Sequence, residues 1–272
     1  MNELIALFSY DFFTNAFLAA ILASVTCGIA GSYIVSRRIV FISGGITHAS
    51  FGGVGIAYFM GLNPILGAAV FGVLSALGIQ VLKDRGKVRE DSAIAIWWAF
   101  GMAVGIICIA LTPGYTPNLM SFLFGNILTV THFDLYLFLG LAIALITFFS
   151  LFFNRILYIA FDEDFARANH IPVRTFNAIL ISLVALTIVL NIKVVGIILV
   201  LSLLTIPQTA VNLFTKNFKQ LIWGSSIVGF VGTFSGLLFS YYADIPSGAA
   251  IIFTLVFLYV TFWVVSKLKY LL

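Results

Sequence analysis

The chain has three histidines, and His48 is the one that lies inside a long apolar segment, VFISGGITHASFGGVGIA. An ionisable group in the hydrocarbon region of a membrane is costly, and its default role is functional. A neutral imidazole at that depth can bind a divalent metal ion of soft to borderline character. The alternative is structural: His48 would form an interhelical hydrogen bond with a backbone carbonyl.

His48 follows Arg38 by ten residues, which is about 15 Å along a helix axis and places it near the bilayer midplane. Gly44 and Gly52 lie one turn before and after it, on the same helix face. Small residues allow helix backbones to approach closely, and they also leave room for a path. Gly44, Gly52 and the neighbouring Thr47 are therefore candidates for lining a metal pathway.

A second candidate region surrounds Pro207 in the segment SLLTIPQTA. Proline removes one backbone hydrogen bond and clashes with the preceding turn, so it predicts an interruption of this span. Broken helices near the midplane often line substrate paths. Ser202, Thr205 and Gln208 are the candidates here, and an ordinary kink patched by hydroxyl groups is the alternative.

Other chemically capable residues favour structural interpretations. On a helix His132 and Asp134 face apart, so they predict a solvated helix start at which Asp134 favours the N-terminal dipole. His170 is predicted to lie on the solvated surface of a loop. Cys27 and Cys108 lie in apolar runs and are expected to act as small buried hydrophobes.

The stretch AFDEDFARANHIPV predicts a short surface helix. Asp162 can cap it, the acidic run suits the N-terminal dipole, and Pro172 can stop it. Phe165 and Ala166 would form an apolar knob between charges. Such a helix has the form of a docking element, and a capped turn without a partner is the alternative.

These residues lie in a chain of 272 residues that is 62% hydrophobic and 9% charged. A water-soluble fold cannot place so much apolar surface, so we predict an all-α polytopic membrane protein with a single domain over residues 1–272. About nine membrane helices are expected, with eight or ten as alternatives because only residues 191–193 separate two of the spans. The nine spans lie near 13–35, 40–60, 64–82, 92–111, 133–153, 174–191, 194–213, 221–241 and 248–266.

The basic residues predict the orientation of these spans. With the N-terminus outside and the C-terminus in the cytosol, 13 of the 14 Lys and Arg residues lie in cytosolic segments, and only Lys193 lies outside. The inverse orientation would violate the positive-inside tendency almost completely. This asymmetry accounts for the net charge of +4 without a nucleic-acid partner.

Five stretches, in this order, give the chain a resemblance to the metal-type (ABC-3) permeases of bacterial ABC importers, a relative of the vitamin B12-type permease bundle. The resemblance covers nearly the full length. It is carried by VFISGGITHASFGGVGIA, REDSAIAIWWAFGMAVGI, FDEDFARANHIPV, VVGIILVLSLLTIPQTA and SGLLFSYYADIPSGAAII.

The resemblance implies a multi-pass permease in the bacterial inner membrane that imports a divalent transition metal. Two permease copies would form the path as a homodimer, a cytosolic ATPase dimer would drive it, and an extracytoplasmic metal-binding protein would deliver the ion. The metal would be cargo, with no bound cofactor. His48 would be the metal ligand. The coupling helix, about 162–170, would seat on the ATPase through Asp162, Glu163, Asp164, Phe165, Ala166, Arg167 and Asn169.

Two positions depart from the family pattern. Many members have Asp where this chain has Gly44, and the loss of a hard oxygen ligand favours zinc slightly over manganese or iron. The coupling helix usually has Gly where this chain has His170.

Two other function classes compete with the ABC permease. A gradient-driven secondary metal transporter is disfavoured by the scarcity of carboxylates at membrane depth. An intramembrane enzyme is disfavoured because the sequence has neither GxSxG nor HExxH, and no second base accompanies His48. The chain also lacks a phosphate-binding loop, so ATP hydrolysis would belong to a separate subunit.

Overall fold

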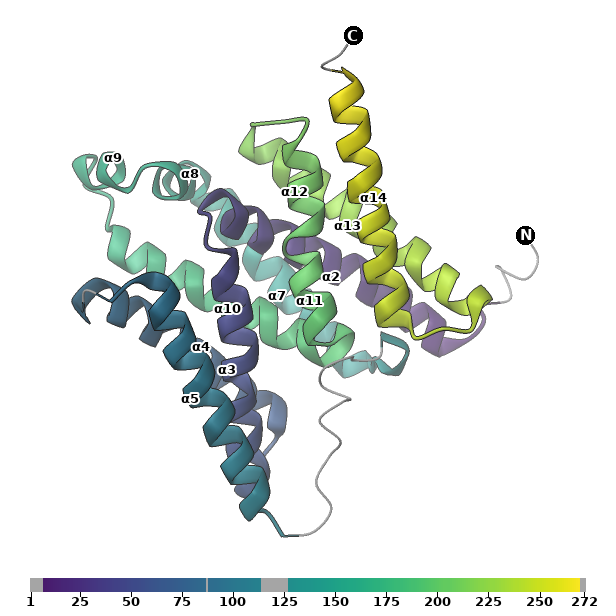
Figure 1. Cartoon of the computed structure of the whole chain (residues 1–272), viewed down its shortest axis with the longest axis horizontal. Coiled ribbons are helices and arrows are strands. Elements are labelled where there is room, and N and C mark those ends of the chain that lie inside the picture. Colours follow the sequence, from purple (N-terminus) through teal and green to yellow (C-terminus); the bar gives the residue numbers. More distant parts are fainter. Residues whose placement is uncertain (1–6, 87, 114–126, 270–272) are drawn as a thin grey trace.

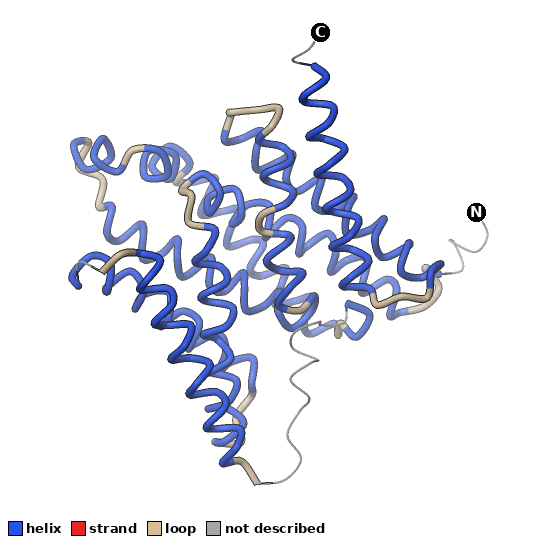
Figure 2. Tube along the Cα trace, in the orientation of Figure 1, coloured by secondary structure: helices blue, strands red, loops and turns tan. Residues whose placement is uncertain are grey.

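The computed structural model describes residues 7–86, 88–113 and 127–269, and within these ranges the chain is helical and has no strand (Figure 2). Eight helices within the described ranges are long and apolar enough to cross a membrane. The predicted all-α polytopic fold is therefore confirmed. These eight helices are α2 (Asp11–Ser36), α3 (Val40–Phe59), α4 (Pro64–Gly86), α5 (Glu90–Leu111), α7 (His132–Leu151), α10 (Val173–Val195), α13 (Phe218–Ala243) and α14 (Ser247–Lys269).

The seventh predicted span, 194–213, consists of two short helices, α11 (Ile197–Leu203) and α12 (Ile206–Asn212). The expected separation at residues 191–193 is wrong, because α10 continues to Val195. The break falls at Gly196, whose φ of 81° and ψ of 164° are accessible essentially only to glycine.

Pro207 is the second residue of α12, so the helix is interrupted before the proline, and the proline does not kink a continuous helix. Because Pro207 has no N–H, it cannot bond to the carbonyl of Leu203 four residues earlier. The Gln208 side-chain Nε2 donates to that carbonyl at 3.0 Å and to the carbonyl of Cys27 in α2 at 2.8 Å. Gln208 thus repairs the break and ties it to α2.

Helices α2 and α3 are the most buried of the eight long helices, and α5 and α14 lie at opposite edges of the molecule (Figure 1). The most apolar windows of α2 and α3 are 72% buried, against 17% for α5 and α14. The outer faces of α5 and α14 are therefore available to lipid or to other subunits. Cys27 is fully buried in α2, as predicted, and Cys108 is half-buried.

Glycines bring the backbone of α3 against two neighbouring helices. A Cβ built on Gly52 would lie 2.8 Å from the carbonyl oxygen of Gly101 in α5, and one on Gly55 would lie 2.5 Å from that of Gly105. Gly53 approaches the carbonyl of Gly67 in α4 even more closely. The close helix approach predicted from the small residues is confirmed.

Helix ends and connections fall into two groups on opposite borders of the molecule (Figure 1). Helices α8 (Phe153–Phe161) and α9 (Glu163–Ala168), the α4–α5 and α12–α13 connections and the C-terminal end of α14 lie along the upper and left border. The α3–α4 and α13–α14 connections and η1 (Ile127–Thr129) lie along the lower and right border. This separation agrees with the two-sided distribution of Lys and Arg, and the orientation of the termini stays a prediction.

Replacing Gly55 by Ala is expected to lower the thermal stability of the purified chain. The new methyl group would overlap the Gly105 carbonyl, and forcing α3 and α5 apart costs roughly 1–3 kcal/mol. Gly140→Ala in α7 is the control, because a Cβ there meets nothing within 4 Å. Equal unfolding temperatures for the two variants in detergent would show that the close approach contributes nothing to stability.

Candidate functional site

His48 lies halfway along α3, on a half-buried face. Its imidazole stacks on the indole of Trp98 in α5, with ring centroids 4.3 Å apart and ring planes 5° apart. Gly44 faces the same indole, since a Cβ built on it would lie 3.9 Å from the Trp98 ring. Gly44, His48 and Trp98 therefore share one face of the α3–α5 pair.

The ring nitrogens of His48 form no hydrogen bond with any residue that the structure describes. The structural alternative, a bond to a backbone carbonyl, is thus not found in these ranges. Stacking covers one face of the imidazole and leaves its edge available to a ligand. The described residues contain no group of three or more His, Cys, Asp or Glu side chains that could hold a metal. The role of His48 as a metal ligand stays a prediction.

Trp98 was absent from the predicted site residues. The sequence does carry a signal for it, because tryptophan prefers membrane interfaces, whereas Trp97 and Trp98 lie two turns inside a span. Trp97 contacts Gly78 of α4, so of the two only Trp98 faces His48.

Thr47 lies on another face of α3 than His48, whereas Gly52 follows His48 by one turn on the side of α5. The hydroxyl of Thr47 donates to the carbonyl of Ser43 at 2.6 Å, and Thr47 lines a cavity of about 240 Å³ together with Tyr58 and Lys193. Gly52 lies in the contact with α5 described above. Their roles in a pathway stay predictions.

Around the break between α11 and α12, the candidate polar groups are bonded within the protein. The hydroxyls of Ser202 and Thr205 donate to carbonyls four residues earlier, at 3.0 and 2.7 Å. Gln208 is fully buried and bonds two carbonyls through its Nε2, while its Oε1 has no partner among the described residues. A pathway role for these three residues also stays a prediction.

At the start of α7, the prediction for Asp134 is correct for the helix N-terminus and wrong for the solvation of its side chain. Thr131 and Asp134 form a capping box, so Asp134 does serve the helix N-terminus, and His132 is exposed as predicted. Asp134 is not solvated, however: it is buried and forms an ion pair with Lys193 at the end of α10. The sequence carries no local signal for this pair, because 59 residues separate Asp134 from Lys193.

The predicted coupling helix corresponds to α9. It begins after Asp162, as predicted, but it does not end where it was predicted to end. The Asp162 carboxylate accepts a hydrogen bond from the Phe165 N–H at 2.9 Å, which confirms the cap. The helix ends at Ala168, four residues before Pro172, so the expectation that the proline stops it is wrong. A left-handed turn ends it: His170 has φ 56°, and the His170 and Ile171 N–H groups donate to the carbonyls of Arg167 and Ala166.

Phe165 and Ala166 do not form one exposed knob. Phe165 is exposed, and so are Asp164, Arg167 and Asn169. Ala166 is buried in a small apolar cluster with Ile159, Val173 and Phe176. The surface that α9 offers to a partner is therefore Phe165 with its charged and polar neighbours.

Glu163 faces inward from α9 into a polar cluster formed by Tyr33, Arg37, Glu163 and Asn177, which we call the Glu163 cluster. Arg37 forms an ion pair with Glu163 at 2.7 Å, and Asn177 Nδ2 donates to the same carboxylate oxygen at 2.8 Å. Burial alone would raise the pKa of Glu163. The hydrogen bonds from Asn177 and Arg37 and the charges of Arg37 and Arg167 outweigh it and hold the pKa below its usual value.

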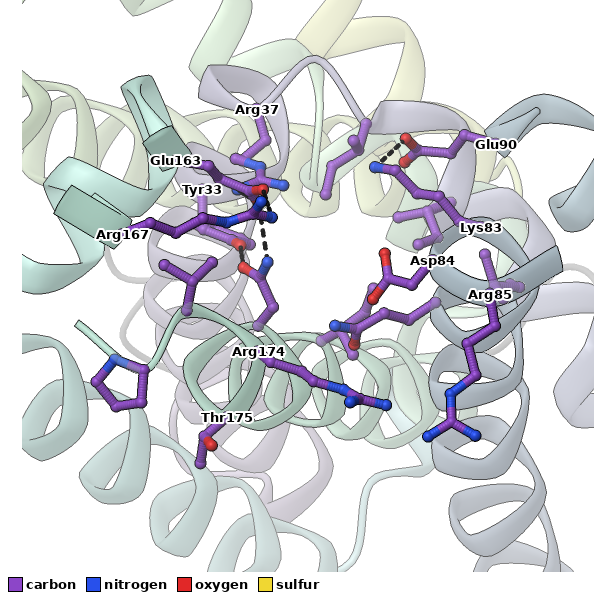
Figure 3. A pocket seen from close by; sticks show the side chains of 18 residues that line it. Tyr33, Arg37, Lys83, Asp84, Arg85, Glu90, Glu163, Arg167, Arg174 and Thr175 are labelled. Atoms are coloured by element: carbon purple, nitrogen blue, oxygen red, sulfur yellow. Dashed lines mark hydrogen bonds and ion pairs between the residues drawn. The ribbon is translucent and has the colours of Figure 1, made fainter. Parts of the chain in front are cut away.

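The Glu163 cluster forms one wall of a cavity of about 580 Å³. Figure 3 shows Arg37, Glu163 and Arg167 on one side of the open space and the Lys83–Glu90 ion pair on the other. Neither the cluster nor the cavity was predicted, because they join helix ends far apart in sequence.

Substituting His170 by Gly is expected to stabilise α9 locally. A left-handed residue with a Cβ costs about 1–2 kcal/mol, partly offset by the greater backbone entropy of unfolded glycine. Amide exchange of residues 163–170 should slow several-fold, while His170→Ala, which keeps the Cβ, should give no such protection. If both variants exchange alike, backbone strain at this position is negligible.

The Glu163 cluster is expected to weaken in acid. Since the pKa of Glu163 is lowered in the folded state, its contribution is present above the unfolded-state pKa and is lost as the pH falls through the folded-state value. A spin label at Ala168→Cys, in a Cys108→Ser background, should become more mobile between pH 7 and pH 4. With Glu163→Gln added, the label should already be mobile at pH 7, and a pH response that persisted in this variant would assign the change to another group.

Comparison with known proteins places this arrangement in context. A sequence model of the ABC 3 transport family matches residues 9–266. The "Probable metal transport system membrane protein" of Chlamydia trachomatis is 40% identical over 241 residues, covering 86% of this chain and 82% of the relative. The manganese transport system membrane protein MntC of Halalkalibacterium halodurans is 34% identical over 246 residues, covering 90% of this chain and 84% of the relative.

A solved structure, PsaBC from Streptococcus pneumoniae in complex with Fab, contains a chain with the same fold. It superposes with a TM-score of 0.85 at 30% identity, covering 96% of this chain and 94% of the other.

Proposed function

The chain belongs to the ABC 3 transport family, and on that premise we propose that it carries a divalent transition metal ion, with manganese as the first candidate. It is a multi-pass membrane protein and a transport subunit, and ATP hydrolysis belongs to a separate subunit. Several relatives bear names that state manganese transport. The preference for zinc that Gly44 suggested gains no support from them.

The observation that carries the proposal is the environment of His48. The imidazole lies halfway along a membrane helix, stacks on the indole of Trp98 and is bonded to no described residue. A polar ring that faces bare hydrocarbon would be costly. The half-buried face of α3 and α5 is therefore expected to meet water or a second permease copy, which would bring a second imidazole to the same place.

One imidazole per chain suits transport better than a closed site. An ion cannot cross hydrocarbon unaided, since even a single charge costs tens of kcal/mol by the Born estimate. A closed four-ligand site would hold the metal tightly, whereas passage requires release. Two imidazoles with water would replace part of the hydration shell and still let the ion leave. Only neutral imidazole binds metal, so acid should weaken the site.

The remaining partners follow from the same proposal. Phe165 and the exposed polar residues of α9 would seat on a cytosolic ATPase dimer. An extracytoplasmic binding protein would deliver the ion to the opposite side. ATP-driven displacement of α9 would then bias the bundle between outward-facing and inward-facing states.

His48→Ala is expected to reduce ATP-dependent manganese uptake at least tenfold, because the ligand at membrane depth is lost. Uptake would be measured in vesicles containing the chain, its ATPase and its binding protein, with zinc as a competitor. His132→Ala is the matched control, since His132 is exposed at the start of α7 and should leave uptake unchanged.

Assembly with the ATPase should survive in both variants. Full uptake by His48→Ala would remove His48 from the mechanism. Uptake by the wild-type chain in vesicles without any ATPase would instead favour a gradient-driven transporter.

A further inference from the structure

Glu163 connects three helices at one point. Its Oε1 accepts hydrogen bonds from Arg37, which caps the C-terminal end of α2, and from Asn177 near the start of α10. Arg37 also donates to the carbonyl of Ile159 in α8 at 2.7 Å. The Tyr33 hydroxyl donates to Asn177 Oδ1 at 3.4 Å and closes the Glu163 cluster from the side of α2.

The Arg37–Glu163 pair differs from the other ion pair of α9. The Arg37 and Glu163 side chains are 14% and 30% exposed, so removing either partner would leave a poorly solvated charge. Arg167 also contacts Glu163, at 3.4 Å, but it lies in the same helix and is 64% exposed. Exposed pairs of this kind contribute little, and this one joins no second element.

The 580 Å³ cavity shows which helices α9 is tied to. Glu163 and Arg167 line one side, and Lys83, Asp84 and Glu90 line the other. The space therefore lies between α9 and the ends of α4 and α5 (Figure 3). Helix α9 itself is bonded to α2 and α10 through the Glu163 cluster.

Helices α2 and α10 are both connected to α3, the helix that bears His48, one through the chain and the other through packing. Only residues 37–39 separate α2 from α3, and α10 packs against α3 and α4. We infer that Arg37 and Asn177 are positioning residues that transmit a displacement of α9 to the α2–α3 corner and to α10. This inference rests on the proposed function, because it takes α9 as the element that the ATPase moves.

The test is the number of manganese ions moved per ATP hydrolysed by the reconstituted complex. Arg37→Met and Asn177→Leu should lower this ratio about threefold, because removing a residue that connects two distant sites weakens the energetic coupling between them. Arg89→Met is the control: it also removes an arginine ion pair, the 3.1 Å pair with Asp91, but an exposed one outside α9 and outside the Glu163 cluster, so its ratio should stay close to that of the wild type. An unchanged ratio in both the Arg37 and Asn177 variants would overturn the inference.

A second measurement uses the chain without partners. A spin label at Ala168→Cys should be more mobile in Arg37→Met and Asn177→Leu than in Arg89→Met. Equal mobility in the three variants would show that the Glu163 cluster does not hold α9, and would likewise overturn the inference. If the wild-type complex hydrolyses ATP and moves no divalent metal, the proposed function fails, and the label still reports whether the cluster fixes α9.

Discussion

Lipid offers no hydrogen-bond partners, so each backbone N–H and C=O at membrane depth must be bonded within the protein. This constraint explains why the described chain is helical and why its one broken span needs repair. Pro207 leaves the Leu203 carbonyl without its helical partner, and Gln208 supplies the missing bond. Most hydroxyls on the spans likewise donate to carbonyls of their own helix. Against this background the half-buried imidazole of His48 differs, because it is bonded to no described residue, and its proposed role as a metal ligand rests on that difference.

Local sequence signals predicted most of the fold. Runs of about 20 apolar residues located all eight long helices, because the thickness of the hydrocarbon sets their length. The glycines of α3 predicted its close packing, and Asp162 predicted the start of α9. These features depend on neighbours within a few turns, so periodicity and residue type are sufficient to find them.

Side-chain pairs between distant segments escaped prediction. The stack of His48 on Trp98, the Asp134–Lys193 pair and the bonds from Arg37 and Asn177 to Glu163 each join different helices. No local pattern encodes which helix ends will meet. The two helix boundaries that were predicted wrongly have a similar cause. Helix α10 ends at the unusual backbone conformation of Gly196, although the polar residue Asn191 was the more conspicuous signal. Helix α9 ends in a left-handed turn at His170, although Pro172 was the more conspicuous signal.

The packing also indicates where motion can occur. Helix α3 contacts α4 and α5 through glycine backbones, so sliding along either contact would open gaps or create clashes. Helix α9 lies across a cavity from the ends of α4 and α5 and is bonded to α2 and α10. A displacement of α9 is therefore expected to move the α3–α5 unit as one body. The bending would then fall at the three-residue link after α2 and at Gly196, where helical hydrogen bonding is already interrupted. His48 and Trp98 would travel together, and the stack that keeps the imidazole edge free would survive the movement.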